Sequence, residues 1–141
     1  MICVADCPVI WKSKLQTETA LSTMEAEYVA LSMAMRELIP LKYGVLEVAS
    51  SIGLKLQEYT EMKNTIWKDN AGTLALAKSE PPMMTPRSRH YAVKYHWFRE
   101  HIIPEKIELV KIETKNQLAD ILTKGLWTDQ FKHIRNLLMG W

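Results

Sequence analysis

The stretch ALSTMEAEYVALSMAMREL, residues 20–38, decides how the first half of the chain folds. Ser22 followed three residues later by Glu25 matches the capping box, in which the hydroxyl and the carboxylate each satisfy a backbone amide at the start of a helix. Glu27 lies about 200° further around the same helix, on its apolar side. That side is formed by Ala30, Leu31, Ala34 and Leu38. Since a buried, unpaired carboxylate costs several kcal/mol, we expect Glu27 to meet a cation or a metal, or to reach water at the edge of the core.

Length and composition indicate one globular domain. The chain has 141 residues, of which 48% are hydrophobic and 24% charged, enough to bury a core. Its net charge of +2 is too small to indicate a nucleic-acid partner by itself. Cys3 and Cys7 come without a secretory signal or an apolar run long enough to cross a membrane, which predicts an intracellular, reduced protein. The four histidines do not complete a zinc site with them.

Turn residues and apolar runs predict the elements of the first half. A hairpin is expected from Ile2–Val4 and Val9–Lys14 around a turn at residues 5–8. A helix should begin near Thr23 and be bent or broken near Pro40, with a second helical piece that ends at Gly53. These elements place Glu27 in the first turn of the long helix.

The second half alternates strands and helices. Asn70 is a typical helix cap, and the proline-rich loop at residues 80–89 cannot be regular structure. The expected elements are a strand at 63–69, helices at 71–79 and 90–103, a strand at 106–113, a short helix at 116–124 and an amphipathic helix at 128–139. The order predicts a mixed α/β arrangement in a single domain, residues 1–141.

Two further carboxylates lie among apolar neighbours. Asp69 ends the first strand of the second half, where α/β sheets commonly place ligand groups, and Asp120 lies inside the short helix. Together with Glu27, they come from three separate elements. If they converge, they could hold hard divalent cations, which prefer oxygen ligands. Spacing alone does not establish that convergence.

Four runs in one order resemble a known family. They are WKSKLQTETALSTMEAEYVALSMAMRE, KDNAGTLALAKS, RSRHYAVKYHWFREHI and QLADILTKGL, which span nearly the whole chain. Together they resemble the C-terminal ribonuclease H domain of Ty1/copia-type retrotransposon polyproteins. The resemblance implies a ribonuclease H-like mixed sheet of five strands flanked by helices. It also implies a hydrolase that cuts the RNA strand of RNA–DNA hybrids with two Mg²⁺ or Mn²⁺ ions.

The resemblance assigns roles residue by residue. It implies catalytic, metal-binding carboxylates at Glu27, Asp69 and Asp120, with Asn116 as a polar helper four residues before Asp120 on the same helical face. The family's first-strand aspartate has no match, and Asp6 lies in the hairpin turn rather than in that strand. The chain is therefore expected to be N-terminally truncated, to lack its first strand and to show little or no hydrolysis alone. Activity would require the full polyprotein or another chain to supply the missing strand, and the upstream reverse transcriptase region of the polyprotein is an expected partner.

Basic residues give the expected contacts to the hybrid. Cations neutralise phosphates, and aromatic rings between them can either stack on bases or pack in the core; helical spacing of the aromatics favours the core. The expected nucleic-acid-binding residues are Arg87, Arg89, Lys94, Arg99, Lys12 and Lys14. Solvated surface lysines explain Lys12 and Lys14 equally well.

Two other functional hypotheses stay open. The chain could be an inactive retroelement remnant with at most residual nucleic-acid binding, or an unrelated α/β interaction module, which requires the four ordered runs to be a coincidence. No membrane partner is expected. The resemblance also implies a location in cytoplasmic particles.

Overall fold

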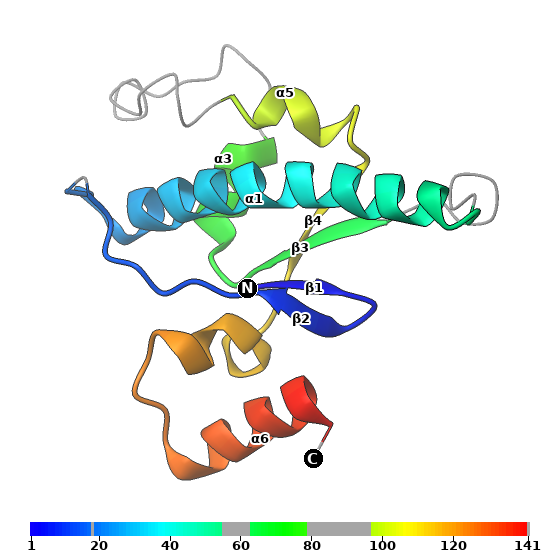
Figure 1. Ribbon diagram of the computed structural model, residues 1–141. Coiled ribbons are helices and arrows are strands. Elements are labelled where there is room, and N and C mark those ends of the chain that lie inside the picture. The colour runs from blue at the N-terminus through cyan, green and yellow to red at the C-terminus, as the bar shows by residue number, and fades with distance from the viewer. Residues whose placement is uncertain (18, 55–62, 79–96, 141) are drawn as a thin grey trace.

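The computed structural model describes residues 1–17, 19–54, 63–78 and 97–140, and it is a mixed α/β fold (Figure 1). In the described part of the chain, β1 and β2 form an antiparallel hairpin, and β3 and β4 form a separate parallel pair. The elements are β1 (Ile2–Val4), β2 (Cys7–Ile10), α1 (Thr23–Ser51), β3 (Asn64–Lys68), α3 (Ala71–Lys78), α5 (Arg99–Ile102), β4 (Ile107–Lys111), the 3₁₀ turns η2 (Thr114–Asn116) and η3 (Leu118–Leu122), and α6 (Thr128–Met139). The α/β class predicted from the sequence is thus confirmed, whereas the strands of the described residues form two separate sheets and not the single mixed sheet that the resemblance implies.

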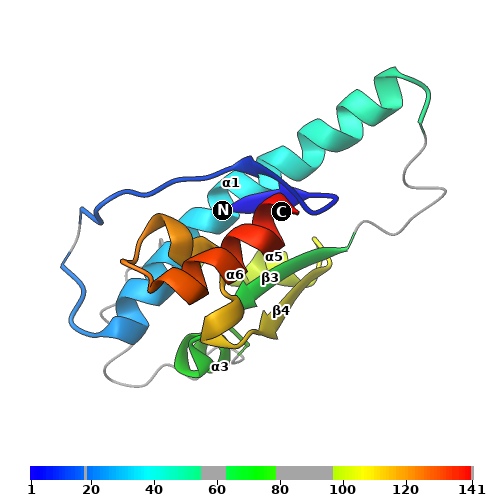
Figure 2. The ribbon, with the colours of Figure 1, turned by 90° about the horizontal axis from the view of Figure 1, so that it is seen from below.

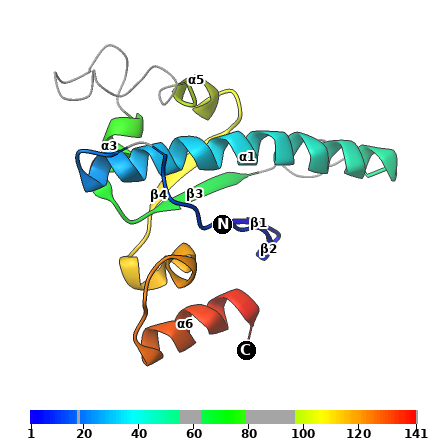
Figure 3. The same ribbon diagram turned by 60° about the vertical axis from the view of Figure 1, so that its left-hand side comes forward.

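Helices lie on both sides of the β3–β4 pair. Figures 1 and 3 show α1, with α3 and α5 beyond it, on one side and α6 on the other. The parallel register runs from Asn64 opposite Ile107 to Lys68 opposite Lys111, so both strands end at the same edge. The view from below in Figure 2 shows α6 in front of α1, with the hairpin beside it. The loop after β3 and the 3₁₀ turns after β4 therefore begin near each other.

One hydrophobic core joins α1 to this sheet. Tyr28 is fully buried and its ring lies 5.3 Å from that of Phe98, centroid to centroid. The other buried members of the core come from α1, α3 and β4: Leu31, Met35, Leu74, Ala77, Ile107 and Leu109. Burial raises the pKa of Tyr28 to about 12, against the opposing effect of the charge and hydrogen bond of Arg99. The apolar side of α1 predicted from residues 20–38 was only partly right: Leu31 is buried and Leu38 packs against the core, but Ala30 and Ala34 are exposed.

The hairpin turn is shorter than predicted. Ala5 and Asp6 have φ of 50° and 61°, as in the two-residue turns whose twist suits a hairpin. Val4 pairs directly with Cys7, so β2 starts at Cys7 and contains Pro8. The predicted bounds of the turn, residues 5–8, and of the second strand, Val9–Lys14, were therefore wrong. Proline is tolerated there because this two-stranded pair has edges at which its missing N–H is not needed.

The long helix is continuous through Pro40. The predicted break was wrong: α1 runs from Thr23 to Ser51 as one element. Leu38 and Ile39, just before the proline, pack against the core, and this burial offsets the backbone hydrogen bond that Pro40 removes. The predicted end is confirmed, because Gly53 has φ of 79° and its N–H donates to the carbonyl of Ser50.

The capping prediction is confirmed with one change of partner. The backbone N–H of Glu25 donates to the Ser22 hydroxyl at 3.1 Å, while the Glu25 carboxylate accepts from the N–H of Leu21 at 2.6 Å instead of from Ser22 itself. Asn70 likewise accepts from the N–H of Thr73 at 3.0 Å and begins α3. Both helices that flank the candidate site therefore start where the sequence predicts.

The short helix expected at residues 116–124 is a pair of 3₁₀ turns. Gln117 is extended, with φ of −72° and ψ of 100°, and its side chain donates to the carbonyl of Trp67 at 3.4 Å. This tether to β3 separates η2 from η3, so the prediction that Asn116 and Asp120 share one α-helical face was wrong. The C-terminal helix is confirmed at Thr128–Met139.

Of the predicted helix at 90–103, only the C-terminal part lies within the described residues, where α5 covers Arg99–Ile102. The proline-rich loop at 80–89 lies outside them. Among the helices of the described ranges, none combines the length and the apolar character that a transmembrane span requires.

Candidate carboxylate site at the strand ends

Glu27 is held by a lysine from the sheet. It lies in the first turn of α1, and its carboxylate accepts a hydrogen bond from the ammonium of Lys68, the last residue of β3. The Glu27 side chain is 40% exposed and that of Lys68 is 13% exposed. The awkward position of this glutamate is thus resolved in two ways that the sequence analysis anticipated, by a cation and by partial exposure to water.

Asp120 is the most deeply buried of the three carboxylates. It lies in η3, and its side chain is 9% exposed. Its Oδ2 accepts from the ammonium of Lys124 at 2.8 Å, an i,i+4 pair whose lysine is half exposed. The backbone N–H of Lys124 also donates to the Asp120 carbonyl at 2.9 Å, which fixes the spacing between the two residues.

Asp69 occupies the turn between β3 and α3. It follows Lys68 directly and precedes the capping residue Asn70, so its backbone is fixed on both sides. Its side chain is half-buried. This is the end of a strand in a parallel pair, the place where α/β sheets commonly carry ligand groups.

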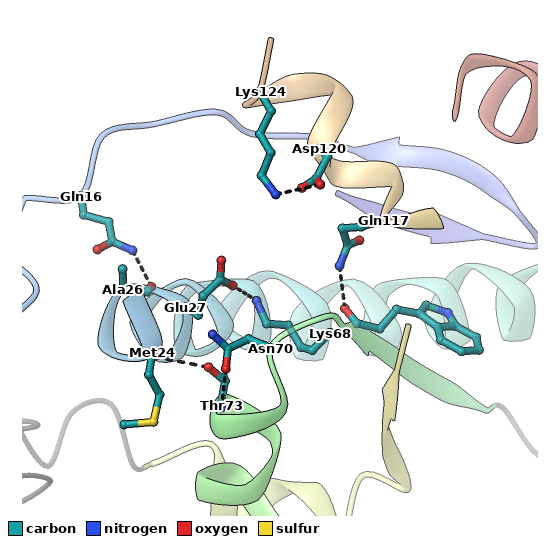
Figure 4. A network of polar contacts seen from close by, with 11 residues as sticks. Gln16, Met24, Ala26, Glu27, Lys68, Asn70, Thr73, Gln117, Asp120 and Lys124 are labelled. Carbon is teal, nitrogen blue, oxygen red and sulfur yellow. Dashed lines mark hydrogen bonds and ion pairs between the residues drawn. The ribbon is translucent and has the colours of Figure 1, made fainter. Parts of the chain in front are cut away.

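Lys124 connects the three carboxylates electrostatically. Its hydrogen bond to Asp120 raises the pKa of Lys124, partial burial opposes the shift, and the negative charges of Asp120, Asp69 and Glu27 raise the pKa further. Figure 4 shows the Asp120–Lys124 pair on the side of η3 that faces Glu27 and Lys68. One ammonium group therefore lies within the field of carboxylates from α1, from the end of β3 and from η3.

The donor chemistry of this cluster suits a hard divalent cation, because it consists of carboxylate oxygens from three rigid elements. A cation already lies among them in the form of the Lys124 ammonium. Within the described ranges, however, no three His, Cys, Asp or Glu side chains are close enough together to hold a metal ion as they stand. The carboxylates would have to exchange their lysine partners to become ligands. The roles predicted for Glu27, Asp69 and Asp120 stay predictions.

The helper predicted at Asn116 has a different neighbour. Its Oδ1 lies 2.9 Å from Nε2 of His133 on α6, at an exposed position. This contact fastens η2 to α6, and the role assigned to Asn116 stays a prediction. His133 was missed by the sequence analysis because nothing in the spacing of residues 116 and 133 relates the two.

Lys68 and Lys124 were also not identified as partners of the carboxylates. For Lys124 the signal was present, since an acid and a lysine four residues apart commonly pair. For Lys68 the sequence contains no comparable local signal. Its contact with Glu27 joins residues 41 positions apart, and only the tertiary fold brings them together.

Some of the predicted nucleic-acid-binding residues lie outside the described part of the chain and others lie within it. Arg87, Arg89 and Lys94 lie outside the described residues. Arg99 is half-buried beside Tyr28. Lys12 is exposed and donates to Glu37 at 2.6 Å, and Lys14 is exposed. These residues stay predicted contacts.

Comparison with known proteins identifies relatives over most of the chain. It is 35% identical over 130 residues, 92% of its length, to the retrovirus-related Pol polyprotein from transposon TNT 1-94 of Nicotiana tabacum. It is 29% identical over 126 residues to the retrovirus-related Pol polyprotein from transposon RE1 of Arabidopsis thaliana, and 30% identical over 119 residues to that from transposon RE2 of the same plant, covering 89% and 84% of the chain. The chain spans only 8–9% of the length of these relatives. No protein-family model and no solved structure matches it.

Proposed function

We propose, from the premise that its homologues are plant retrovirus-related Pol polyproteins, that the chain is a ribonuclease H-type segment of a retroelement polyprotein. In a complete domain it would hydrolyse the RNA strand of RNA–DNA hybrids. The observation that supports the proposal is the placing of two ion pairs, Glu27–Lys68 and Asp120–Lys124, on facing elements at the end of β3, which Asp69 follows directly (Figure 4). Three carboxylates from three separate elements are what a metal-dependent phosphodiesterase needs.

The roles of the carboxylates follow from where they stand. Glu27, Asp69 and Asp120 would hold Mg²⁺ or Mn²⁺, which when bound supplies activation of water and neutralisation of charge at the phosphate. Asp120, the most buried, presents its oxygens from a rigid 3₁₀ turn, whereas Glu27 projects from a capped helix end that fixes its direction. The capped start of α3 fixes Asp69 in the same way. The chain thereby orients the oxygens before a substrate arrives.

A missing strand would explain why the two sheets stay separate. A cavity of about 190 Å³ lies between β1, the start of β3 and α1, which contributes Leu38, Leu41 and Val45. In the described chain β3 pairs only with β4, and β1 only with β2, so each has an edge available toward the other. We propose that a strand from an upstream polyprotein region lies in this gap and carries the fourth carboxylate.

A hybrid substrate would contact the basic surface. Lys14 is exposed, and Lys12 is held only by an exposed pair with Glu37, so both can reach phosphates at small cost. Arg87, Arg89, Lys94 and Arg99 are proposed to take part as well. This contact would position the RNA strand without reading its sequence.

The second candidate is an inactive remnant. It is favoured by the lysine partners of Glu27 and Asp120 and by the lack, among described residues, of side chains grouped closely enough to hold a metal. A remnant would retain the fold and at most residual nucleic-acid binding.

Cleavage of an RNA–DNA hybrid with labelled RNA separates the two candidates. The purified chain would be compared with a version that carries an additional N-terminal strand with an aspartate, each with Mg²⁺ or Mn²⁺. We expect cleavage only in the extended version, and its loss when Glu27→Gln is introduced there. Absence of cleavage in a folded, extended version would support the remnant. Cleavage by the unextended chain that survives Glu27→Gln would show that these carboxylates are not the site.

A further inference from the structure

The first turns of α1 and α3 lie against each other. A Cβ atom at residue 72 would lie 3.2 Å from Sδ of Met24 and 3.3 Å from Oδ1 of Asn70, which is tighter than most such contacts in proteins. Gly72, which has no Cβ, therefore allows the backbone of α3 to approach α1 at this point. Figure 4 shows the two helix starts together, with Glu27 about one turn beyond Met24.

Thr73 makes a polar contact with each side of this junction. It is fully buried, and its hydroxyl donates to the backbone carbonyl of Met24 at 3.4 Å. Its backbone N–H donates to the side chain of Asn70, which follows Asp69 directly, at 3.0 Å. One buried residue thus connects the backbone next to Asp69 to the start of the helix that carries Glu27.

The apolar contacts between the two helices do not fix this relation. Leu74 and Ala77 of α3 belong to the same buried core as Tyr28 and Leu31 of α1. Hydrophobic burial is non-directional, so it holds the helices together without determining how far one is shifted along the other. A hydrogen bond depends on both distance and angle, so the contact between Thr73 and Met24 determines that shift.

We propose that Thr73 is a positioning residue, which fixes the first turn of α1, with Glu27, against the end of β3, with Lys68 and Asp69. The Glu27 carboxylate and the Lys68 ammonium come from different elements, and they meet only while those elements keep their places. This positioning stands without the proposed function, whereas an effect of Thr73 on hydrolysis rests on it.

NMR spectroscopy of the full 141-residue chain tests the positioning. The Thr73 hydroxyl proton should exchange slowly with water and show a nuclear Overhauser effect to Met24, because it is buried and hydrogen-bonded. Thr73→Val keeps the shape of the side chain without the hydroxyl, and it should weaken the Overhauser effects between the Glu27 and Lys68 side chains. Thr73→Ser keeps the hydroxyl and should retain them. If Thr73 contributed only stability, these effects would not change in a variant that circular dichroism shows to be folded.

Thr128→Val is the matched control, because it makes the same chemical change at an exposed residue at the start of α6. It should leave the Glu27–Lys68 effects as they are in the unmodified chain. An equal weakening in the control, an equal weakening in Thr73→Ser, or no weakening in Thr73→Val would each overturn the inference. If Thr73→Val does not fold, the hydroxyl proton still decides: exchange as fast as that of the Thr128 hydroxyl would refute the proposed contact.

Hybrid cleavage separates this inference from the proposed function. In the version extended by an N-terminal strand, Thr73→Val should lower kcat about tenfold and leave KM for the hybrid unchanged, since Thr73 is buried and acts only through the placing of Glu27. Weakened Glu27–Lys68 effects in a chain whose extended version cleaves no hybrid would keep the positioning role and reject the ribonuclease. Cleavage by the extended version with the same kcat in Thr73→Val would reject the positioning role and keep the ribonuclease.

Discussion

Carboxylates pair with lysines at both ends of the β3–β4 pair, but the pairing is more complete at the amino end than at the carboxyl end. At the amino end, Glu105 accepts from Lys42 at 2.7 Å and from the Tyr43 hydroxyl at 2.5 Å, one on each carboxylate oxygen. The Glu105 backbone carbonyl also accepts from Lys42 and from Asn64, each at 3.0 Å. At the carboxyl end, Glu27 pairs with Lys68 and Asp120 with Lys124, and the Lys124 side chain is half exposed.

The difference separates a structural ion pair from one that can be exchanged. Lys42 and Glu105 have side chains only 14% and 10% exposed, and the surrounding hydrogen bonds join α1 to both strands. A cluster so fully satisfied offers no oxygen to a ligand. The carboxyl end keeps excess negative charge and an exposed partner, so its oxygens can change partners at lower cost.

Loss of the Glu105 charge should destabilise the chain most. Glu105→Gln leaves the Lys42 ammonium largely buried without its anion, and we expect a loss of about 3 kcal/mol in the free energy of unfolding. Urea denaturation followed by circular dichroism measures it. Glu108→Gln, at an exposed position on β4, is the control and should have little effect. An equal loss in both variants would mean that the amino-end cluster is no more structural than the surface.

The pairing of Glu105 also predicts that the free energy of unfolding decreases at acid pH. The hydrogen bonds from Lys42 and Tyr43 lower the pKa of Glu105, against partial burial and aided by the charges of Lys42 and His101. Because the folded pKa lies below the ordinary value of 4.5, this contribution is fully present above pH 4.5 and is lost as the pH falls through the folded pKa.

Urea midpoints between pH 6 and pH 2.5 test this contribution. The unmodified chain should lose stability faster than Glu105→Gln below pH 4.5. Parallel profiles for the two chains would contradict the proposed charge pairing.

Breaking the ion pair at the carboxyl end should cost less than breaking the one at the amino end. Glu27 is 40% exposed, so water replaces part of what Glu27→Gln removes, but the Lys68 side chain is only 13% exposed and loses its anion, and we expect an intermediate loss of about 2 kcal/mol. The same urea experiment measures it. A loss as large as that of Glu105→Gln would mean that the Glu27–Lys68 pair is a structural anchor, which would remove the contrast between the two ends.

Local rules predicted the start and the end of α1 and the start of α3, but not the contacts between elements. Ser22, Asn70 and Gly53 act on backbone groups within a few residues, so their effects could be read from the sequence. Pro40 was misjudged because packing of α1 against the core, a tertiary effect, outweighs one lost hydrogen bond. The 3₁₀ turns were misjudged because Gln117 is held by the carbonyl of Trp67.

The same distinction applies to the candidate site. Asp120 could be selected because it is an acid among apolar neighbours, and Asp69 because it ends a strand, and both are properties of the local sequence. Their lysine partners could not be assigned so readily, since Lys68 meets Glu27 only after the sheet and α1 have packed. Glu105 was not singled out at all, because Lys42 and Tyr43 reach it across more than 60 residues.

The smallest expected effect is a change in the pKa of Lys124, and it reports most directly on the charges at the carboxyl end of the strand pair. The hydrogen bond to Asp120 and the charges of Asp120, Asp69 and Glu27 hold the pKa of Lys124 above its ordinary value. Titration of the lysine Cε resonance by NMR should therefore show a lower Lys124 pKa in Asp120→Asn, and smaller decreases in Asp69→Asn and Glu27→Gln, than in the unmodified chain. Asp129→Asn on α6 serves as the control and should leave it unchanged, because Asp129 is not among the charges that act on Lys124. If only Asp120→Asn lowers the pKa, the three carboxylates do not share one field, and the carboxyl end is two separate ion pairs like those elsewhere on the surface.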